Sequence, residues 1–269
     1  MSGSIVTLLS DFGLKDPYVA EMKAVILAIC PNARIIDISH LIEKFNVKIG
    51  AFVLASAARY FADGAIHVAV VDPGVGTKRR ALLAQTKRAF YIGPDNGILM
   101  LAAKQDPINH VFTLTNPEFM LPKISSTFHG RDVFAPAAAH LANGVKPERF
   151  GPEISDFTVP SFAQPVLQAK GLAGEVLYID DFGNVVTNIT GADLRKAGIK
   201  VGERLVIRLK NKSYHANLST AYGEGAPRSL LALIGSHGLI EIAVNQGSAS
   251  EKLRVKVGDA MNIGENGDS

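Results

Sequence analysis

Apolar runs and helical patterns alternate along the first half of the chain. Five runs lack the polar alternation of a half-exposed strand, and we expect buried strands at residues 4–11, 33–40, 65–72, 81–85 and 89–93. The segments between them predict helices that begin at Pro17 behind an Asp16 N-cap, at 47–61, after the turn at 95–97 and at 131–144. Buried strands separated by helices are typical of a mostly parallel sheet with helices on both faces.

The pattern changes at residues 151–171, where three prolines interrupt any periodicity. Beyond this stretch, short apolar runs are broken by Gly, Asn or Asp, and we expect strands at residues 174–180, 184–189, 203–209, 212–218, 229–235, 239–245 and 252–258. Such a series is typical of a small antiparallel barrel or sandwich. We therefore predict an α/β N-terminal domain at 1–160, a linker at 161–171 and a smaller β domain at 172–269.

The composition is that of a globular protein, with 47% hydrophobic and 20% charged residues among 269. No apolar run approaches the roughly 20 residues that span a bilayer, and the first residues lack the basic start of a signal peptide. The single cysteine, Cys30, excludes an intrachain disulfide and a cysteine-built metal site, so a cytoplasmic location is expected. The net charge of +3 is weak and scattered, which does not favour nucleic acid as a partner.

Three aspartates occupy the same position in the pattern. Asp11, Asp37 and Asp72 each lie at or near the end of a predicted strand, and in an open parallel sheet ligands bind beyond the carboxyl ends of the strands. The alternative is that they only start turns or cap helices, which is the better interpretation for Asp37. Asp11 is followed by Gly13 and Asp16, which predicts a tight loop presenting two carboxylates to ribose hydroxyls, a metal or a cation.

Further candidate groups lie in other loops. His129 stands beside Gly130 at the start of a predicted helix, where the positive helix end favours a neutral imidazole. In the second domain, residues 180–184 and 235–238 interrupt apolar runs. Each could be a plain hairpin turn, or the first could present an aromatic ring and amides to an adenine.

Several familiar motifs are missing from the sequence. It contains no GxxxxGK[ST], no GxGxxG after a strand, no HExxH and no GxSxG. Phosphate-loop, dinucleotide, zinc-protease and serine-esterase chemistry therefore lose their simplest support. The residues alone indicate a cleft lined by Asp11, Asp72, His129 and Arg79.

Five sequence blocks occur in the order found in a known family, at residues 10–26, 70–80, 91–99, 126–142 and 179–189. Together they resemble the S-adenosylmethionine hydrolases, also called SAM hydroxide adenosyltransferases, which are related to fluorinating and chlorinating enzymes. The resemblance runs from about Ser4 to about Met261. Five blocks in matching order make it far more specific than any one motif.

The resemblance implies an α/β N-terminal domain, a C-terminal antiparallel β-barrel and a homotrimer with sites between subunits. It implies attack of water or hydroxide on ribose C5′ of S-adenosyl-L-methionine, which gives adenosine and L-methionine without a cofactor or metal. The catalytic set of the family falls on Asp72, Arg79 and His129. The substrate contacts fall on Asp11 at the ribose with Asp16 nearby, Phe182 and Asn184 at the adenine, Asp180 at the methionine ammonium and Ser236 at the methionine carboxylate.

Two departures separate the chain from the halogenating relatives. Those enzymes carry an insertion after the block at 70–80, and they have a tyrosine at Asp72 and lack His129. They also carry arginine at His237, whose role stays open. The rival functions are an S-adenosylmethionine-dependent 5′-halogenase and a non-catalytic nucleoside- or RNA-binding protein, for which we find no aromatic-plus-basic strand pattern.

The proposed chemistry needs a positioned nucleophile, because a sulfonium is already a good leaving group. Asp72 and His129 are both candidate proton acceptors, and Arg79 could instead stabilise a bound hydroxide. We favour an orienting Asp72–Arg79 pair with His129 nearer the proton, and the sequence leaves the alternatives open. Lys78 and Arg80, the other two cations of the block, are expected to be solvated.

Overall fold

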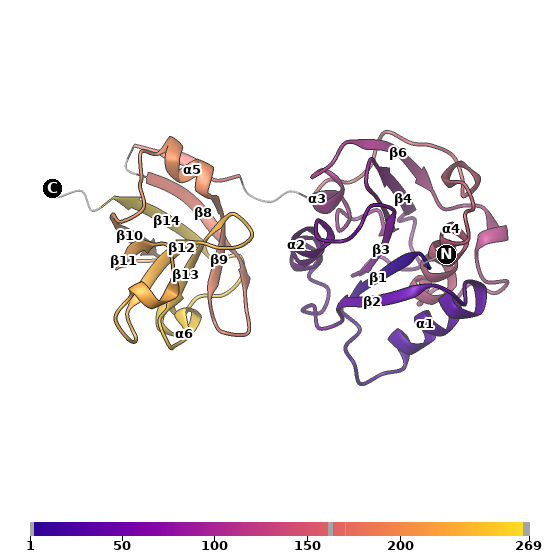
Figure 1. Ribbon diagram of the computed structural model, residues 1–269, viewed down its shortest axis with the longest axis horizontal. Helices are drawn as coiled ribbons and strands as arrows, with labels where there is room; N and C mark the ends of the chain where they lie inside the picture. The colour runs from indigo at the N-terminus through magenta and orange to yellow at the C-terminus, as the bar shows by residue number, and fades with distance from the viewer. Residues whose placement is uncertain (1–2, 161–163, 170, 266–269) are drawn as a thin grey trace. The chain divides into compact units, whose positions relative to one another are not determined.

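The computed structural model describes residues 3–160, 164–169 and 171–265. They divide into two compact units with a boundary between Pro160 and Ser161 (Figure 1). Residues 161–163 and 170 of the predicted linker lie outside the described residues, and Val166–Gln168 within it forms strand β7. Among the helices of the described ranges, none combines the length and hydropathy needed to cross a membrane.

The first unit is built on one sheet with the strand order β2-β1-β3-β5-β4-β6. The neighbours β1/β2, β1/β3 and β3/β5 are parallel, whereas β4 runs antiparallel to β5 and β6. The predicted mostly parallel sheet is therefore confirmed. The strands are β1 Ile5–Ser10, β2 Arg34–Ser39, β3 Ala65–Val70, β4 Ala81–Thr86, β5 Ala89–Pro94 and β6 Ile108–Thr113.

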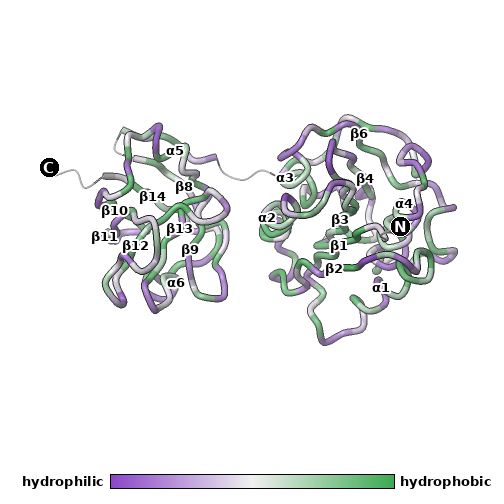
Figure 2. Tube along the Cα trace, in the orientation of Figure 1, coloured by the Kyte–Doolittle hydropathy of each residue, from purple (hydrophilic) through white to green (hydrophobic). Residues whose placement is uncertain are grey.

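Helices cover both faces of this sheet, as predicted. In Figure 1, α2 (Val47–Ala58) and α3 (Met100–Ala103) lie on one side, and α1 (Tyr18–Ile29) and α4 (Ala135–Ala142) on the other. Side chains of a strand alternate between faces, so the buried central strands β1 and β3 supply core to both layers and are apolar along most of their length (Figure 2). Short 3₁₀ turns at Pro117–Phe119 and Pro147–Arg149 complete the unit.

Local details of this unit correct the sequence analysis at three places. Asp16 does not cap α1; Pro17 occupies the N-cap position without a side-chain hydrogen bond. The predicted helix at 131–144 begins as a π-helical turn, Gly130–Phe134, before α4. Strand β6 was not expected, because its first half is only partly buried and lacks an apolar run.

The second unit is a closed barrel. Seven strands of the described ranges follow the order β14-β10-β11-β12-β13-β9-β8, and β14 pairs back onto β8, while β7 extends β8 at the outside. The predicted antiparallel barrel is confirmed, with one parallel pair, β11/β12, joined through a 3₁₀ turn at Tyr222–Glu224. The strands are β8 Gly171–Ile179, β9 Val185–Thr190, β10 Arg204–Leu209, β11 Lys212–Ser219, β12 Leu230–Ile234, β13 Leu239–Val244 and β14 Ala260–Glu265.

The last predicted strand, residues 252–258, is wrong. Its first part belongs to helix α6 (Ala249–Leu253), which Ser248 caps by accepting a hydrogen bond from Glu251 N at 3.2 Å. Arg254 then adopts a left-handed conformation with φ 54°, which ends the helix. A capping box of Thr190 and Asp193 also begins a short helix, α5 (Gly191–Lys196), that apolar alternation alone did not indicate.

Candidate active site

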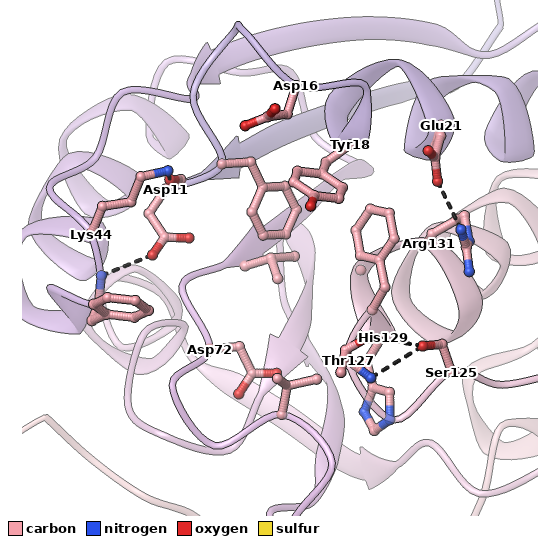
Figure 3. Close-up of a pocket in the computed structure, with 16 residues that line it drawn as sticks. Asp11, Asp16, Tyr18, Glu21, Lys44, Asp72, Ser125, Thr127, His129 and Arg131 are labelled. Atoms are coloured by element: carbon pink, nitrogen blue, oxygen red, sulfur yellow. Dashed lines mark hydrogen bonds and ion pairs between the residues drawn. The ribbon is translucent and has the colours of Figure 1, made fainter.

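A cavity of about 620 Å³ opens at the carboxyl ends of β1 and β3, within the size range of small-molecule sites. Ser10 and Val70 are paired in parallel register at the ends of these strands, so Asp11 and Asp72, which follow them closely, lie at one edge of the sheet. Figure 3 shows their side chains around a common space. The lining residues are Asp11, Phe12, Asp16, Tyr18, Glu21, Lys44, Phe45, Val70, Asp72, Val75, Ser125, Thr127, Phe128, His129, Gly130 and Arg131.

The turn after β3 places Asp72 and Arg79 together. Val75 N donates to Asp72 O at 3.2 Å, and Thr77 Oγ1 donates to the carbonyl of Gly74 at 2.7 Å. Gly76 has φ +75°, and a Cβ there would collide with the backbone carbonyl of Ser126. The glycine therefore lets the turn pack directly against the loop that carries His129.

Asp72, Arg79 and His129 form one connected set. Arg79 Nε donates to Asp72 Oδ1 at 3.1 Å, and its Nη2 donates to Asp72 Oδ2. In this ion pair, the side chain of Asp72 is only 6% exposed and that of Arg79 only 8%. Arg79 Nη2 also lies 3.1 Å from His129 Nδ1. The central carbon of the guanidinium lies over the ring of Phe134, 5.4 Å from its centroid, a cation–π contact.

The contact with Arg79 determines the form of His129. A guanidinium can only donate hydrogen bonds, so His129 Nδ1 accepts and the ring proton of the neutral imidazole resides on Nε2. Burial and the nearby Arg79 charge lower the pKa of His129 from its ordinary value of 6.5. The imidazole is therefore neutral at pH 7.

Lys78 and Arg80, the two cations beside Arg79, have different surroundings in the structure. Lys78 is exposed, as expected. Arg80 is partly exposed, at 35% of its side chain, and is also ion-paired, which was not expected. Its Nε and Nη2 donate to Asp95 Oδ2 at 2.9 and 2.6 Å, and Nη1 donates to Asp156 Oδ1 at 3.0 Å. Asn96 Nδ2 donates to the carbonyl of Val71 at 2.8 Å. The loop at 93–97 thus supports the end of β3 structurally.

Asp11 and Asp16 lie on the same cavity wall, in the loop between β1 and α1 (Figure 3). Asp11 is 6% exposed, and its Oδ2 accepts from Phe45 N at 2.9 Å, while its carbonyl accepts from Lys44 Nζ. Asp16 is exposed. With no capping role for its side chain, Asp16 remains available to a ligand.

Three aromatic rings line the cavity beside these carboxylates. Phe12, Tyr18 and Phe128 are mutually edge-on, with centroids 5.2–5.8 Å apart. Aromatic faces attract cations, so a site with several carboxylates and three rings suits a positively charged ligand. Tyr18 and Phe128 were not expected in the site, because an isolated aromatic residue at a helix start or in a loop carries no spacing signal.

A buried carboxylate holds the loop in front of His129. Asp132 is fully buried; its Oδ2 accepts from Ser125 N at 2.7 Å and its Oδ1 accepts from Arg131 Nε at 2.7 Å. Arg131 Nη1 reaches Glu21 Oε2 at 2.8 Å, and the guanidinium lies 4.9 Å from the Phe128 ring. This network was not expected, because its sequence signal is limited to the charged pair Arg131-Asp132 inside an apolar helix.

The C-terminal candidates lie in two turns of the barrel. Asp180 Oδ1 accepts from Phe182 N at 3.0 Å and Asn184 N at 2.8 Å, and Asn184 Nδ2 donates to Asp180 Oδ2 at 2.9 Å. The Phe182 ring is 81% exposed. Ser236 is exposed in the β12–β13 turn. These residues therefore present polar groups and an uncovered aromatic face from the second unit.

Residues in the described ranges form no group of His, Cys, Asp and Glu side chains suited to a metal ion.

Glu241 is a further buried carboxylate, near the turn at residues 180–184. Its Oε1 accepts a hydrogen bond from Tyr222 Oη at 2.5 Å. Burial and the charge of Asp180 raise the pKa of Glu241. It was not expected, because it lies inside an apolar strand pattern.

Comparison with known families gives two matches along the chain. A model of the SAM hydroxide adenosyltransferase N-terminal domain matches residues 6–151, and a model of the C-terminal domain of the same family matches residues 174–262. Together they cover most of both units.

Individual proteins agree with this result. The chain is 42% identical to an (R)-S-adenosyl-L-methionine hydrolase of Thermus thermophilus, covering 94% of this chain and 96% of that one, and 34% identical to the enzyme of that name from Methanocaldococcus jannaschii, covering 96% and 95%. A fluorinase of Nocardia brasiliensis is 28% identical, with 96% of each chain covered. An uncharacterized conserved protein of Thermotoga maritima superposes with a TM-score of 0.93 at 39% identity, covering 97% of this chain and all of that one.

Proposed function

Because the chain belongs to the SAM hydroxide adenosyltransferase family, we propose that it hydrolyses S-adenosyl-L-methionine to adenosine and L-methionine. The observation that carries the proposal is the buried Asp72–Arg79–His129 set beside a cavity rich in carboxylates. The names of the relatives specify the (R) form of the substrate, so the (R) epimer at sulfur is the proposed substrate.

The reaction is a displacement at ribose C5′. The oxygen of one water molecule bonds to C5′, the C5′–S bond breaks, and sulfur keeps the electron pair as the neutral thioether of methionine. One proton is released from the water. The site must hold that water behind C5′ in line with the C–S bond, and such orientation contributes several kcal/mol to a rate.

The hydrogen bonds around His129 support a proposal for the path of the proton. Since Nδ1 of His129 accepts from Arg79, the ring offers an N–H donor at Nε2, and the carboxylate of Asp72 is the remaining acceptor. Water placed between them donates to Asp72 and accepts from His129. This assignment reverses our sequence-based preference, in which His129 took the proton; Arg79 orients both partners.

The remaining residues suit the rest of the substrate. Asp11 and Asp16 line the cavity wall and would hold the ribose hydroxyls and the adjacent cationic part. Phe182 and Asn184 would contact the adenine, Asp180 the methionine ammonium and Ser236 its carboxylate, as the family resemblance implies. The carboxylates complement the sulfonium and ammonium charges.

The proposed enzyme is a homotrimer that needs no cofactor or metal. The trimer follows from the family resemblance and brings together substrate contacts from the two kinds of unit; the uncovered Phe182 ring is consistent with a partner surface. A metal is unnecessary because the sulfonium is already activated, so a chelator should leave turnover unchanged. A cytoplasmic location stays a prediction.

Incubation with S-adenosyl-L-methionine in ¹⁸O-water tests the proposed function. We expect adenosine that carries the label in its 5′-hydroxyl, and unlabelled methionine, because the new bond forms between water oxygen and C5′. S-adenosylhomocysteine is the matched control: it lacks the sulfonium and should not react. Unchanged substrate would contradict the proposal, and 5′-halo-adenosine formed in the presence of chloride or fluoride would favour the halogenase.

The acid limb of the pH–rate profile should lie below pH 6.5. Burial and Arg79 lower the pKa of His129 below that value, so its active neutral form persists as the pH falls through 6.5 and is lost only lower. A proton on Nδ1 would then face the Arg79 guanidinium and break the contact. The profile of kcat/KM measures this limb; Lys78→Met, which alters an exposed neighbouring cation, should leave it in place. An acid limb above pH 6.5 would argue against the assignment.

A further inference from the structure

A buried polar chain runs beneath the loop that carries Asp11. Ser10 Oγ lies 2.7 Å from His40 Nδ1, and His40 Nε2 lies 3.1 Å from Asp37 Oδ1. Lys23 Nζ donates to Asp37 Oδ2 at 2.6 Å. Ser10 and His40 are 0% and 3% exposed, whereas Asp37 reaches the surface. This Ser10–His40–Asp37 relay joins β1, the loop after β2 and β2 itself, and Lys23 connects it to helix α1.

The relay consists of one hydrogen bond to the loop, one between Ser10 and His40, and one close contact with Asp37. The Phe12 amide donates to Ser10 Oγ at 3.3 Å, and Ser10 Oγ and His40 Nδ1 share a hydrogen bond whose donor is set by the His40 tautomer. His40 Nε2 meets Asp37 Oδ1 at an ion-pair distance without hydrogen-bond geometry. Although burial opposes it, the contacts with Lys23 and His40 lower the pKa of Asp37, which is consistent with an ionised acceptor at the end of the relay.

The hydroxyl–imidazole–carboxylate order resembles that of a nucleophilic triad, but Ser10 does not have the position of a nucleophile. Its side chain is fully buried, and it is not among the residues that line the cavity. A nucleophilic hydroxyl must reach the reacting atom. The relay therefore acts on the fold around it and not on substrate.

Two members of the relay, Ser10 and His40, hold the loop at residues 11–13. Ser10 Oγ accepts from Phe12 N, and the carbonyl of His40 accepts from Gly13 N at 2.7 Å. Gly13 has φ +75°, a backbone conformation that glycine adopts without steric cost. Glycine also has more conformational freedom than other residues, so the two hydrogen bonds restrict this part of the loop. Asp11 and Phe12, carried by this loop, both line the cavity.

We propose that Ser10, His40 and Asp37 are positioning residues that hold the Asp11 loop in its substrate-binding geometry. The proposal rests on the proposed function, because the contact it supports is that of Asp11 with the ribose. Displacement of a binding group by about 1 Å can cost about 10²-fold in rate. The relay thus gives a role to Asp37, which the strand pattern had left as a turn former.

Ser10→Ala tests the proposal against a matched control, Thr7→Val. Both changes remove a buried hydroxyl of β1 that bonds an imidazole, since Thr7 Oγ1 lies 2.8 Å from His67 Nδ1, but only Ser10 contacts the loop. We expect Ser10→Ala to lower kcat/KM by roughly 10- to 100-fold, mainly through KM, and Thr7→Val to change neither constant. The wild-type preference for substrate over its 2′-deoxy analogue should shrink in Ser10→Ala alone.

Amide hydrogen exchange supplies a readout that does not depend on turnover. The amides of Phe12 and Gly13 should exchange faster in Ser10→Ala and in His40→Ala than in the wild type or in Thr7→Val. If the wild type fails to turn over S-adenosyl-L-methionine, the proposed function fails while this arm still tests the relay. Unchanged exchange in a folded Ser10→Ala variant, or equal kinetic losses in Ser10→Ala and Thr7→Val, would overturn the proposal.

Discussion

Asp72→Asn is expected to lower kcat by roughly 10²–10⁴-fold, the range measured for a positioned acid–base group, while the substrate KM changes little. Asparagine keeps the size of the side chain but removes the acceptor that takes the proton from water. The ribose, adenine and methionine contacts lie elsewhere, so binding should survive. Steady-state kinetics with S-adenosyl-L-methionine, and equilibrium binding of the same substrate, check the two halves of this expectation.

Asp95→Asn is the matched control for this change. Asp95 is a buried carboxylate paired with Arg80, the residue next to Arg79. Each variant removes the buried ionic partner of an arginine, although Arg80 keeps its pair with the exposed Asp156, so each should lose folding stability. Only Asp72→Asn should lose the chemical step. A folded Asp72→Asn enzyme with kcat within a few-fold of wild type would rule out Asp72 as the proton acceptor.

His129→Ala is expected to lower kcat by about 10²-fold or more. The variant removes the N–H donor that we propose holds the attacking water, while Arg79 keeps its two hydrogen bonds to Asp72 and the fold is retained. The same variant should also lose the acid limb of the pH–rate profile, because the group that titrates there is gone. Stopped turnover assays between pH 5 and 8 measure both effects.

His140→Ala provides the comparison for that variant. His140 belongs to the following helix, packs edge-on against Phe119 at 5.2 Å, and burial also lowers its pKa. It does not line the cavity. This change should affect stability but not kcat or the acid limb. If both histidine variants kept normal rates, His129 would have no part in catalysis.

Much of the fold was predictable from local pattern. Strands without polar alternation indicated a covered parallel sheet, and residues 174–245 predicted the barrel strands. The errors came where a local signal was weak or conflicting. Residues 252–258 alternate apolar and polar side chains like a strand, yet the Ser248 cap and the left-handed Arg254 direct the chain into α6. Strand β6 has a half-exposed beginning, so burial from neighbouring strands formed it without a clear signal.

The candidate site was predictable in part for a physical reason. Parallel neighbouring strands end at one edge of a sheet, so Asp11 and Asp72 were expected to meet there, and they line one cavity. The resemblance indicated Arg79 as the partner of Asp72, as observed. His129 and Arg79 were already cleft candidates from the residues alone; the resemblance gave them catalytic roles and joined the C-terminal residues to them, which no local pattern could have done.

By itself, the sequence determined the two-part architecture, the strand-end position of the acidic groups and the family. These three features follow from local sequence patterns, that is, from residues close together in the chain. Only the tertiary structure decided which nitrogen of His129 carries the proton, that Arg80 pairs with Asp95 and Asp156, and that Asp37 joins a relay with His40 and Ser10. Those outcomes depend on distances between atoms that are far apart in the sequence, and turns such as the one at Gly76 set these distances. Which atom donates a hydrogen bond is decided only when such residues come into contact.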